Sequence, residues 1–293
     1  MPLLLPLLLA ACGGAPPPGE GSGPDGATDG ATSPNGTADA APAPASDGGT
    51  VTAPGSANAS GGSGGGDLSA CPSCRVHVPQ GYNPAVPIRL VVSLHGDEGR
   101  DFGLDSATGG VIGLWQTAAD AAGYLLFAPA CPAALGCDGA FSDWLAADGY
   151  DPSPAALGWL DGQVAELETR YNIDRSREYL TGYSGGAYWL GAYAPARASR
   201  YAAVAFIAGG MPAYNAFHGC AACKIPGYFL GGDGDYRTGG QMSDTANAFK
   251  GCGQEIHLEL VTGADHEATI ASLGTGNAAK ILTWFDDRAL SCP

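Results

Sequence analysis

After residue 70, continuous apolar segments alternate with segments of mixed polarity. Ile88 to Leu94 is apolar at nearly every position, and such a run is typical of a strand that is buried on both faces. Further strands are predicted at 75–78, 124–128, 178–181, 202–208, 227–231 and 256–261, and helices at 113–122, 157–171, 186–194, 243–250 and 277–290. This alternation predicts a doubly wound, mostly parallel α/β sheet with helices on both faces. Its functional residues should gather at the carboxyl ends of the strands.

The first 70 residues differ in composition from the rest of the chain. Residues 1–12 consist of Met1 followed by Leu, Pro and Ala and end in Cys12, which is typical of an export signal and also resembles a bacterial lipobox. This apolar run is too short for a spanning helix, which needs about 20 residues. Residues 13–70 are rich in Gly, Ala, Pro and Ser without Lys or Arg, so we expect a disordered tether. Residues 71–293 then form one folded domain, which is exported and either lipid-anchored through Cys12 or secreted.

The chain has nine cysteines, and all except Cys12 lie in the predicted folded domain. An even number of cysteines in an exported domain predicts disulfides. Eight cysteines allow roughly a hundred connectivities, so a pairing between cysteines that are neighbours in the sequence is only one option among them. The rival hypothesis is a zinc site built from the two CxxC pairs, but we favour disulfides and expect no metal and no other cofactor. The local pairing would join Cys71 with Cys74, Cys131 with Cys137, Cys220 with Cys223, and Cys252 with Cys292.

The formal net charge is −16, and the 13 Lys and Arg residues are spread thinly. A nucleic-acid partner would need a clustered cationic face, so this class of function is excluded. An acidic surface of this kind indicates solubility and carries little information about neutral ligands.

A serine motif stands at the end of the predicted strand 178–181. The segment Gly182-Tyr183-Ser184-Gly185-Gly186 matches GxSxG and leads directly into a predicted helix. The same pattern occurs around Ser63, but that copy lies in the tether with no strand or helix beside it. Small flanking residues are needed because the serine occupies a sharp strand-to-helix turn. Ser184 is therefore the predicted nucleophile, and the alternative is a Gly-Ser-Gly turn without chemistry.

A serine nucleophile requires a base to take its proton and a carboxylate to orient that base. With this type of elbow the chain order is Ser, acid, His. His266 follows the last predicted strand in a loop, whereas His257 lies inside that strand, so His266 is the predicted base. His77 and His218 are interpreted as surface or packing residues, and His95 as a buried hydrogen-bonding residue. We expect activity to fall on acidification, because a protonated His266 cannot act as a base.

The acid should follow the strand 227–231, where the sequence offers Asp233 and Asp235. We favour Asp235 because the glycines around it let the turn project it back over the sheet. Asp233 remains the alternative, and Asp265, next to the base, ranks third.

The oxyanion of the tetrahedral intermediate needs amide donors. One should be the N–H of Gly185, directly after the nucleophile. The other should come from the loop after strand 88–94, from Asp97 or otherwise from Gly96.

Four segments give the chain a family resemblance: Val92 to Gly96, Tyr171 to Arg175, Tyr179 to Gly186 and Ala202 to Gly209. They resemble the feruloyl esterase and polyhydroxybutyrate depolymerase group of the α/β-hydrolases over roughly residues 75 to 290. The resemblance implies the α/β-hydrolase fold, supports Asp235 as the acid and places the base at His266. The chain departs from the group at Asp97 and at Ala187-Tyr188-Trp189, which leaves the substrate pocket undefined.

The predicted function is that of a serine esterase acting outside the cytoplasm through an acyl-enzyme. The resemblance implies feruloyl or acetyl esters of plant walls, polyesters or small acyl esters as substrates. A serine peptidase and a surface lipoprotein without chemistry are the alternatives. We expect a monomer that contacts membranes only through Cys12. Aromatic residues that could line its substrate site are Trp144, Trp159, Tyr183 and Trp189.

Overall fold

A computed structural model describes residues 71–98, 102–130, 133–135, 137, 144, 154–211 and 219–292. The predicted signal, the lipobox cysteine, the tether, Cys131 and His218 all lie outside these residues. Over the described ranges, no helix combines the length and the apolar character needed to cross a membrane.

The core of the domain is a sheet that contains seven strands in the described part of the chain, in the order β1-β3-β2-β4-β5-β6-β7. β1 pairs with β3 in antiparallel orientation, and every other neighbouring pair is parallel. The predicted doubly wound, mostly parallel sheet is therefore confirmed. The strands are β1 (Arg75–His77), β2 (Ile88–Leu94), β3 (Tyr124–Ala128), β4 (Ile173–Tyr183), β5 (Ala203–Ile207), β6 (Gly227–Gly232) and β7 (Ile256–Val261).

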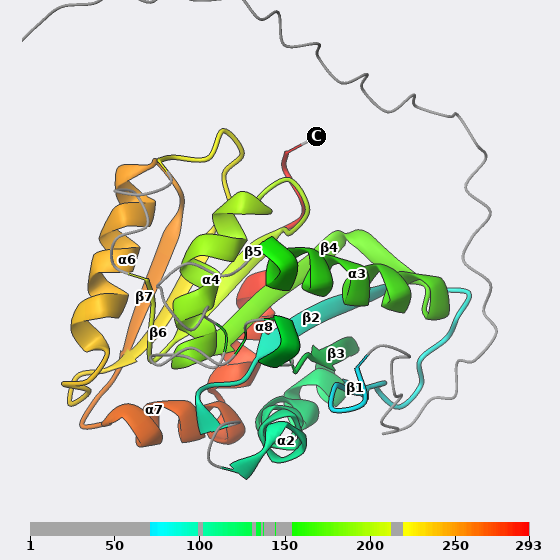
Figure 1. Ribbon diagram of the computed structural model, residues 1–293, viewed down its shortest axis with the longest axis horizontal. Helices are drawn as coiled ribbons and strands as arrows, with labels where there is room; N and C mark the ends of the chain where they lie inside the picture. Colours follow the sequence, from blue (N-terminus) through cyan, green and yellow to red (C-terminus); the bar gives the residue numbers. More distant parts are fainter. Residues whose placement is uncertain are drawn as a thin grey trace, which may run out of the picture. The chain divides into compact units, whose positions relative to one another are not determined.

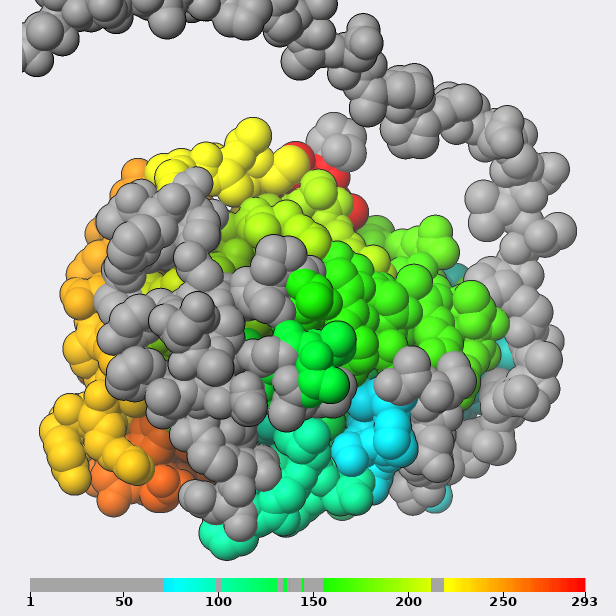
Figure 2. All heavy atoms as spheres, viewed as in Figure 1, coloured from blue at the N-terminus to red at the C-terminus, as the bar shows by residue number. Residues whose placement is uncertain are grey.

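Helices pack against both faces of this sheet (Figure 1). Successive residues of a strand point to opposite faces, so Leu90 and Val92 of β2 join one core cluster while Val91 joins the other. Helices α3, α4 and α6 contribute to the first cluster, and α2 and α8 to the second. In the space-filling view, the green α3 segment reaches the surface of the face shown and the orange α6 segment lies at its edge (Figure 2). The helices are α2 (Leu104–Ala122), α3 (Pro154–Arg170), α4 (Gly185–Ala196), α6 (Gly239–Gly251), α7 (His266–Ala271) and α8 (Asn277–Asp286), with short 3-10 turns η1 (Ala133–Leu135) and η2 (Ser272–Thr275).

Several elements begin earlier than the sequence predicts, and the difference is largest for α2 and β4. Helix α2 starts at Leu104 rather than near residue 113, because packing overrides the low helix propensity of Gly109 and Gly110. Strand β4 starts at Ile173 rather than at Glu178, since its first half is partly exposed and lacks a continuous apolar pattern.

The disulfides confirm one predicted pair and correct two others. Cys71 bonds Cys74 as expected. Cys220 instead bonds Cys252 at the end of α6, and Cys223 bonds Cys292 near the C-terminus. The segment before β6 thus lies beside two chain segments that are remote in sequence, a proximity that only the fold creates. Both CxxC pairs consequently hold disulfide sulfurs rather than the thiolates that zinc binds.

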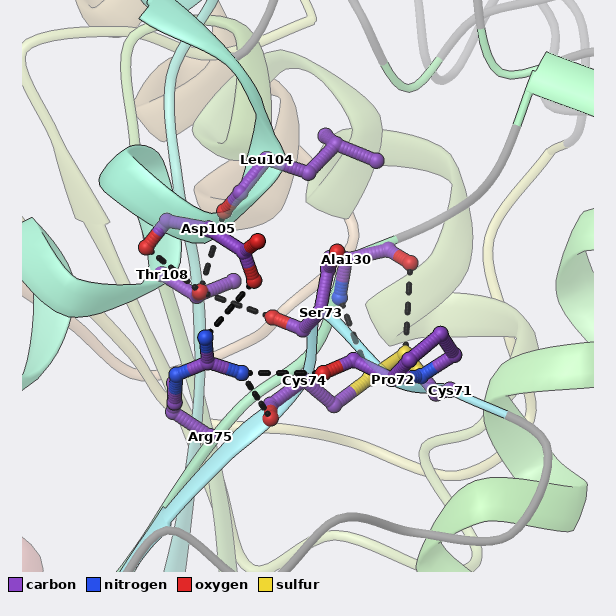
Figure 3. The surroundings of a disulfide bond; sticks show 9 residues. All are labelled: Cys71, Pro72, Ser73, Cys74, Arg75, Leu104, Asp105, Thr108 and Ala130. Atoms are coloured by element: carbon purple, nitrogen blue, oxygen red, sulfur yellow. Dashed lines mark hydrogen bonds and ion pairs between the residues drawn. A yellow bond between two sulfur atoms is a disulfide. The ribbon is translucent and has the colours of Figure 1, made fainter.

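The local disulfide ties the start of the described chain to the sheet. The Sγ atom of Cys71 lies 3.4 Å from the Ala130 carbonyl oxygen, and the Ala130 N–H approaches Cys74 Sγ at 3.3 Å (Figure 3). Thr108 of α2 donates to the Ser73 carbonyl at 2.8 Å. These contacts join β1 to the end of β3 and to α2. Cys137 is also disulfide-bonded, and its predicted partner Cys131 lies outside the described residues.

Candidate active site

The serine motif forms a tight turn between β4 and α4. Ser184 has a φ of 50°, a left-handed conformation that is strained for a residue with a side chain. A Cβ atom on Gly182 would lie 2.8 Å from the Gly186 carbonyl carbon, and one on Gly186 would lie 2.4 Å from the His95 carbonyl oxygen. The glycines are therefore required because β4, α4 and the loop after β2 approach one another at this turn.

A chain of hydrogen-bonding side chains begins at this serine. Ser184 Oγ lies 3.0 Å from Nε2 of His266, and His266 Nδ1 lies 3.0 Å from Oδ2 of Asp235. Ser184 follows β4, Asp235 follows β6, and His266 begins α7 after β7. Parallel strands place their carboxyl ends at one edge of the sheet, so residues that are far apart in sequence meet there. The structure thus brings together the three residues predicted to act on one another.

The alternative candidates for the acid and the base make contacts outside this chain of hydrogen bonds. Asp233 is exposed and accepts a hydrogen bond from the Gly263 N–H at 2.6 Å, which braces the loop after β7. Asp265 caps α7 by accepting from the Ala268 N–H. His257 is exposed on the edge strand β7, with its ring 4.6 Å from that of Tyr228.

The carboxylate of Asp235 is held by several donors at once. Its Oδ1 accepts from the backbone N–H groups of Arg237 and Thr238 at 2.9 and 3.0 Å. The Thr238 hydroxyl lies 2.6 Å from Oδ2, 3.2 Å from His266 Nδ1 and 2.8 Å from the Ala208 carbonyl oxygen. Burial acts to raise the pKa of Asp235, but the hydrogen bonds from Thr238 and His266 outweigh it and leave this pKa below its usual value. Asp235 therefore stays ionised beside the imidazole.

Sequence reasoning did not identify Thr238 as part of this cluster. The signal that could have found it is an aspartate followed, at i+3, by the residue that directly precedes the next helix, since Asp235 forms a local turn with the start of α6.

The two residues predicted to supply oxyanion donors lie beside the nucleophile. Gly185 is the first residue of α4, where helical N–H groups lack intrahelical partners and the helix dipole favours negative charge. Asp97 lies in the loop after β2, and both residues line the same cavity as Ser184. His95 is buried, which lowers its pKa to about 4, and its Nδ1 lies 2.6 Å from the Gly96 carbonyl oxygen. A neutral, buried His95 in contact with this carbonyl oxygen agrees with the buried hydrogen-bonding role predicted for it.

Ser184 opens into a cavity of about 760 Å³. Of the four aromatic residues expected to line a substrate site, Tyr183 does so, whereas Trp144 and Trp189 are buried in the core and Trp159 packs against that core. Tyr188, which lies in the segment where the chain departs from the family pattern, also lines the cavity. It was not among the aromatic residues predicted to do so. The other residues that line this cavity are Asp97, Glu98, Phe102, Gly185, Arg237, Thr238, Gln241, His266, Glu267 and Ile270.

Two curated proteins show sequence similarity to most of the folded domain. Feruloyl esterase C of Emericella nidulans is 25% identical over 231 residues, covering 71% of this chain and 80% of its own length. The probable feruloyl esterase C of Aspergillus oryzae is 27% identical over 237 residues, with the same coverage of 71% and 80%. No family model matches the chain.

Solved structures show that the fold is shared more widely than the sequence. A thermostable esterase superposes with a TM-score of 0.58 at 21% identity, covering 74% of this chain and 59% of its own chain. An S-formylglutathione hydrolase from Agrobacterium tumefaciens superposes with a TM-score of 0.53 at 16% identity, covering 73% of this chain and 89% of its own. The predicted resemblance and fold are confirmed: this chain has the α/β-hydrolase fold and is a distant homologue of feruloyl esterase C.

Proposed function

We propose that this protein is a serine hydrolase of carboxylic esters. The observation that carries the proposal is the continuous series of contacts from Ser184 Oγ through His266 to the Asp235 carboxylate, at the edge of a cavity. A serine hydroxyl by itself is a poor nucleophile at neutral pH, and this arrangement is the one that activates it.

In the acylation step, Ser184 Oγ forms a bond to the ester carbonyl carbon while His266 Nε2 takes the hydroxyl proton. Asp235 accepts a hydrogen bond from the Nδ1–H group of His266, which orients the imidazole, and it stabilises the imidazolium that forms. The negative charge on the former carbonyl oxygen is stabilised by the N–H groups of Gly185 and Asp97. The intermediate then expels the alcohol, which receives the proton from His266, and leaves an acyl group on Ser184.

Deacylation repeats these steps with water as the nucleophile. His266 takes a proton from the water, whose oxygen attacks the acyl carbonyl carbon. The second tetrahedral intermediate expels Ser184 Oγ, which recovers its proton, and the carboxylic acid leaves. The protein's residues thus end the cycle in the state in which they began.

For the substrate, we propose esters of the kind that the names of the two relatives indicate, namely feruloyl esters. The resemblance on which this rests covers the catalytic segments, whereas the cavity residues Asp97 and Tyr188 depart from the group. Acetyl esters, polyesters and small acyl esters are therefore tested beside feruloyl esters in one substrate panel.

We also propose that the protein acts outside the cytoplasm, anchored through Cys12 or secreted. The disulfides among its cysteines support this location, because disulfides persist in oxidising compartments.

The test is covalent labelling with a fluorophosphonate probe, followed by hydrolysis of p-nitrophenyl acetate. We expect the wild type to be labelled and active, and Ser184→Ala to lose both properties. Ser63→Ala, in the second copy of the motif, is the matched control and should retain both. A wild type that resists labelling would favour a protein without chemistry, and cleavage of aminoacyl-anilides in place of esters would favour a peptidase.

A further inference from the structure

Tyr183, immediately before the nucleophile, connects the serine turn to the loop after β2. Its side chain is buried, with 4% of the residue exposed, and its hydroxyl donates a hydrogen bond to Oε1 of Glu98. The ring of Tyr183 also lies against Gly96. One phenol group therefore contacts the loop at two points, on either side of Asp97.

The same loop packs directly on the nucleophile. A Cβ atom on Gly96 would lie 2.7 Å from Glu98 Oε2, 3.0 Å from Cε2 of Tyr183 and 3.1 Å from Cβ of Ser184. The loop at Gly96 is therefore packed closely on Glu98, Tyr183 and Ser184, so a shift of Tyr183 or Glu98 would change the contacts of the backbone at Gly96 and Asp97. Asp97 lines the cavity beside Ser184 whereas Gly96 is not among its lining residues, so the second donor to the oxyanion is assigned to Asp97 rather than Gly96.

In the Tyr183–Glu98 hydrogen bond, the phenol is always the donor and the carboxylate the acceptor. Burial and the nearby Glu98 carboxylate raise the pKa of Tyr183 well above its usual value, so the phenol keeps its proton and donates the hydrogen bond, which Glu98 accepts. A hydrogen bond to a charged acceptor is stronger than one between neutral groups.

We propose that Tyr183 and Glu98 are positioning residues that hold the Asp97 N–H at the place where the oxyanion forms. The inference rests on the proposed function, because it concerns the transition state of that reaction. Oxyanion donors contribute to the rate only when they are fixed before the charge develops. A displacement of about 1 Å at such a site can cost about 100-fold in rate.

The test compares Tyr183→Phe with the wild type on p-nitrophenyl acetate and on phenylboronic acid, which forms a tetrahedral adduct with an active serine. We expect kcat to fall about 10-fold to 100-fold with KM little changed, because the hydrogen bond acts on the transition state. The inhibition constant for phenylboronic acid should rise by a similar factor while the melting temperature stays within a few degrees of the wild type.

Substitutions of Glu98 test the same bridge from the other side. Glu98→Ala removes the acceptor and should reproduce the effect of Tyr183→Phe on kcat and on phenylboronic acid. Glu98→Gln keeps an acceptor oxygen and should restore most of both. If Glu98→Gln is as impaired as Glu98→Ala, the hydrogen bond is not what positions the loop. This pair also keeps the inference testable if Tyr183→Phe fails to fold.

Tyr228→Phe is the matched control. Tyr228 is equally buried and donates to Glu259 between β6 and β7, at the end of β6 remote from Asp235. Its loss removes the same kind of hydrogen bond and should leave kcat and the inhibition constant unchanged. The inference is overturned if Tyr183→Phe behaves like Tyr228→Phe in an enzyme that the fluorophosphonate probe labels. A wild type that is not labelled would instead overturn the proposed function.

Discussion

Two buried carboxyl groups of this domain have opposite electrostatic behaviour. Asp235, in the candidate active site, and Glu178, in β4, are 6% and 1% exposed. The pKa of Asp235 is lowered, whereas burial raises the pKa of Glu178 to about 8. Burial alone therefore does not decide whether a carboxyl group in this protein is ionised at neutral pH.

The difference lies in the donors around each group. Asp235 follows the end of β6, where the backbone N–H groups of Arg237 and Thr238 are turned toward its Oδ1. Glu178 lies inside the sheet, where backbone donors bond to neighbouring strands, and it is paired with Leu90 of β2. It shares Arg200 with Glu168, so a second carboxylate competes for the same cation. A loop at the end of a strand can thus stabilise a carboxylate that the interior of the strand cannot.

The largest effect is expected when the ionised member of the pair is neutralised. Asp235→Asn should lower kcat about 1,000-fold to 10,000-fold, because an amide cannot stabilise the imidazolium and favours the wrong tautomer of His266. The measurement is the steady-state rate on p-nitrophenyl acetate. Asp233→Asn, two residues away, should stay within a few-fold of the wild type. Equal losses in the two variants would contradict the assignment of the acid.

The next effect concerns stability rather than rate. The folded-state pKa of Glu178 is raised from 4.5 to about 8, so its contribution to stability is complete below about pH 4.5 and is lost as the pH rises toward 8. Asp235 has the opposite sign, because its contribution is lost as the pH falls through its lowered pKa.

Glu178→Gln should therefore gain stability relative to the wild type as the pH rises from 5 to 8. We expect a gain of about 1–3 kcal/mol in the free energy of unfolding, since a buried group that must otherwise ionise is replaced by a neutral one. Denaturant unfolding of both proteins at the two pH values measures this difference. A difference that does not depend on pH would mean that Arg200 keeps Glu178 ionised throughout.

The smallest effect should come from one donor to Asp235. Thr238→Val removes a hydroxyl that contacts both Asp235 and His266, and we expect kcat to fall about tenfold, as for one hydrogen bond to a charged group. Thr238→Ser retains the hydroxyl and should recover most of the rate. If Thr238→Val is as active as Thr238→Ser, the backbone donors alone hold the carboxylate.

The sequence by itself determined the class of fold and pointed to Ser184 and His266 of the candidate site. Apolar runs indicated most strands of the parallel sheet. The GxSxG motif indicated Ser184, because its glycines avoid steric clashes at the turn. Patterns of this kind depend on neighbours along the chain, and such neighbours are visible in the sequence. The order of serine, acid and histidine followed from the strands after which they stand.

Only the tertiary structure decided the relations between remote segments. It distinguished Asp235 from Asp233 by the direction of their contacts, paired Cys220 with Cys252, and placed Trp144 and Trp189 in the core. It also brought Tyr183 against Glu98 and Thr238 against His266. The sequence does not specify these pairs because each depends on how separate strands and helices meet in space, and their spacing along the chain carries no signal of that contact.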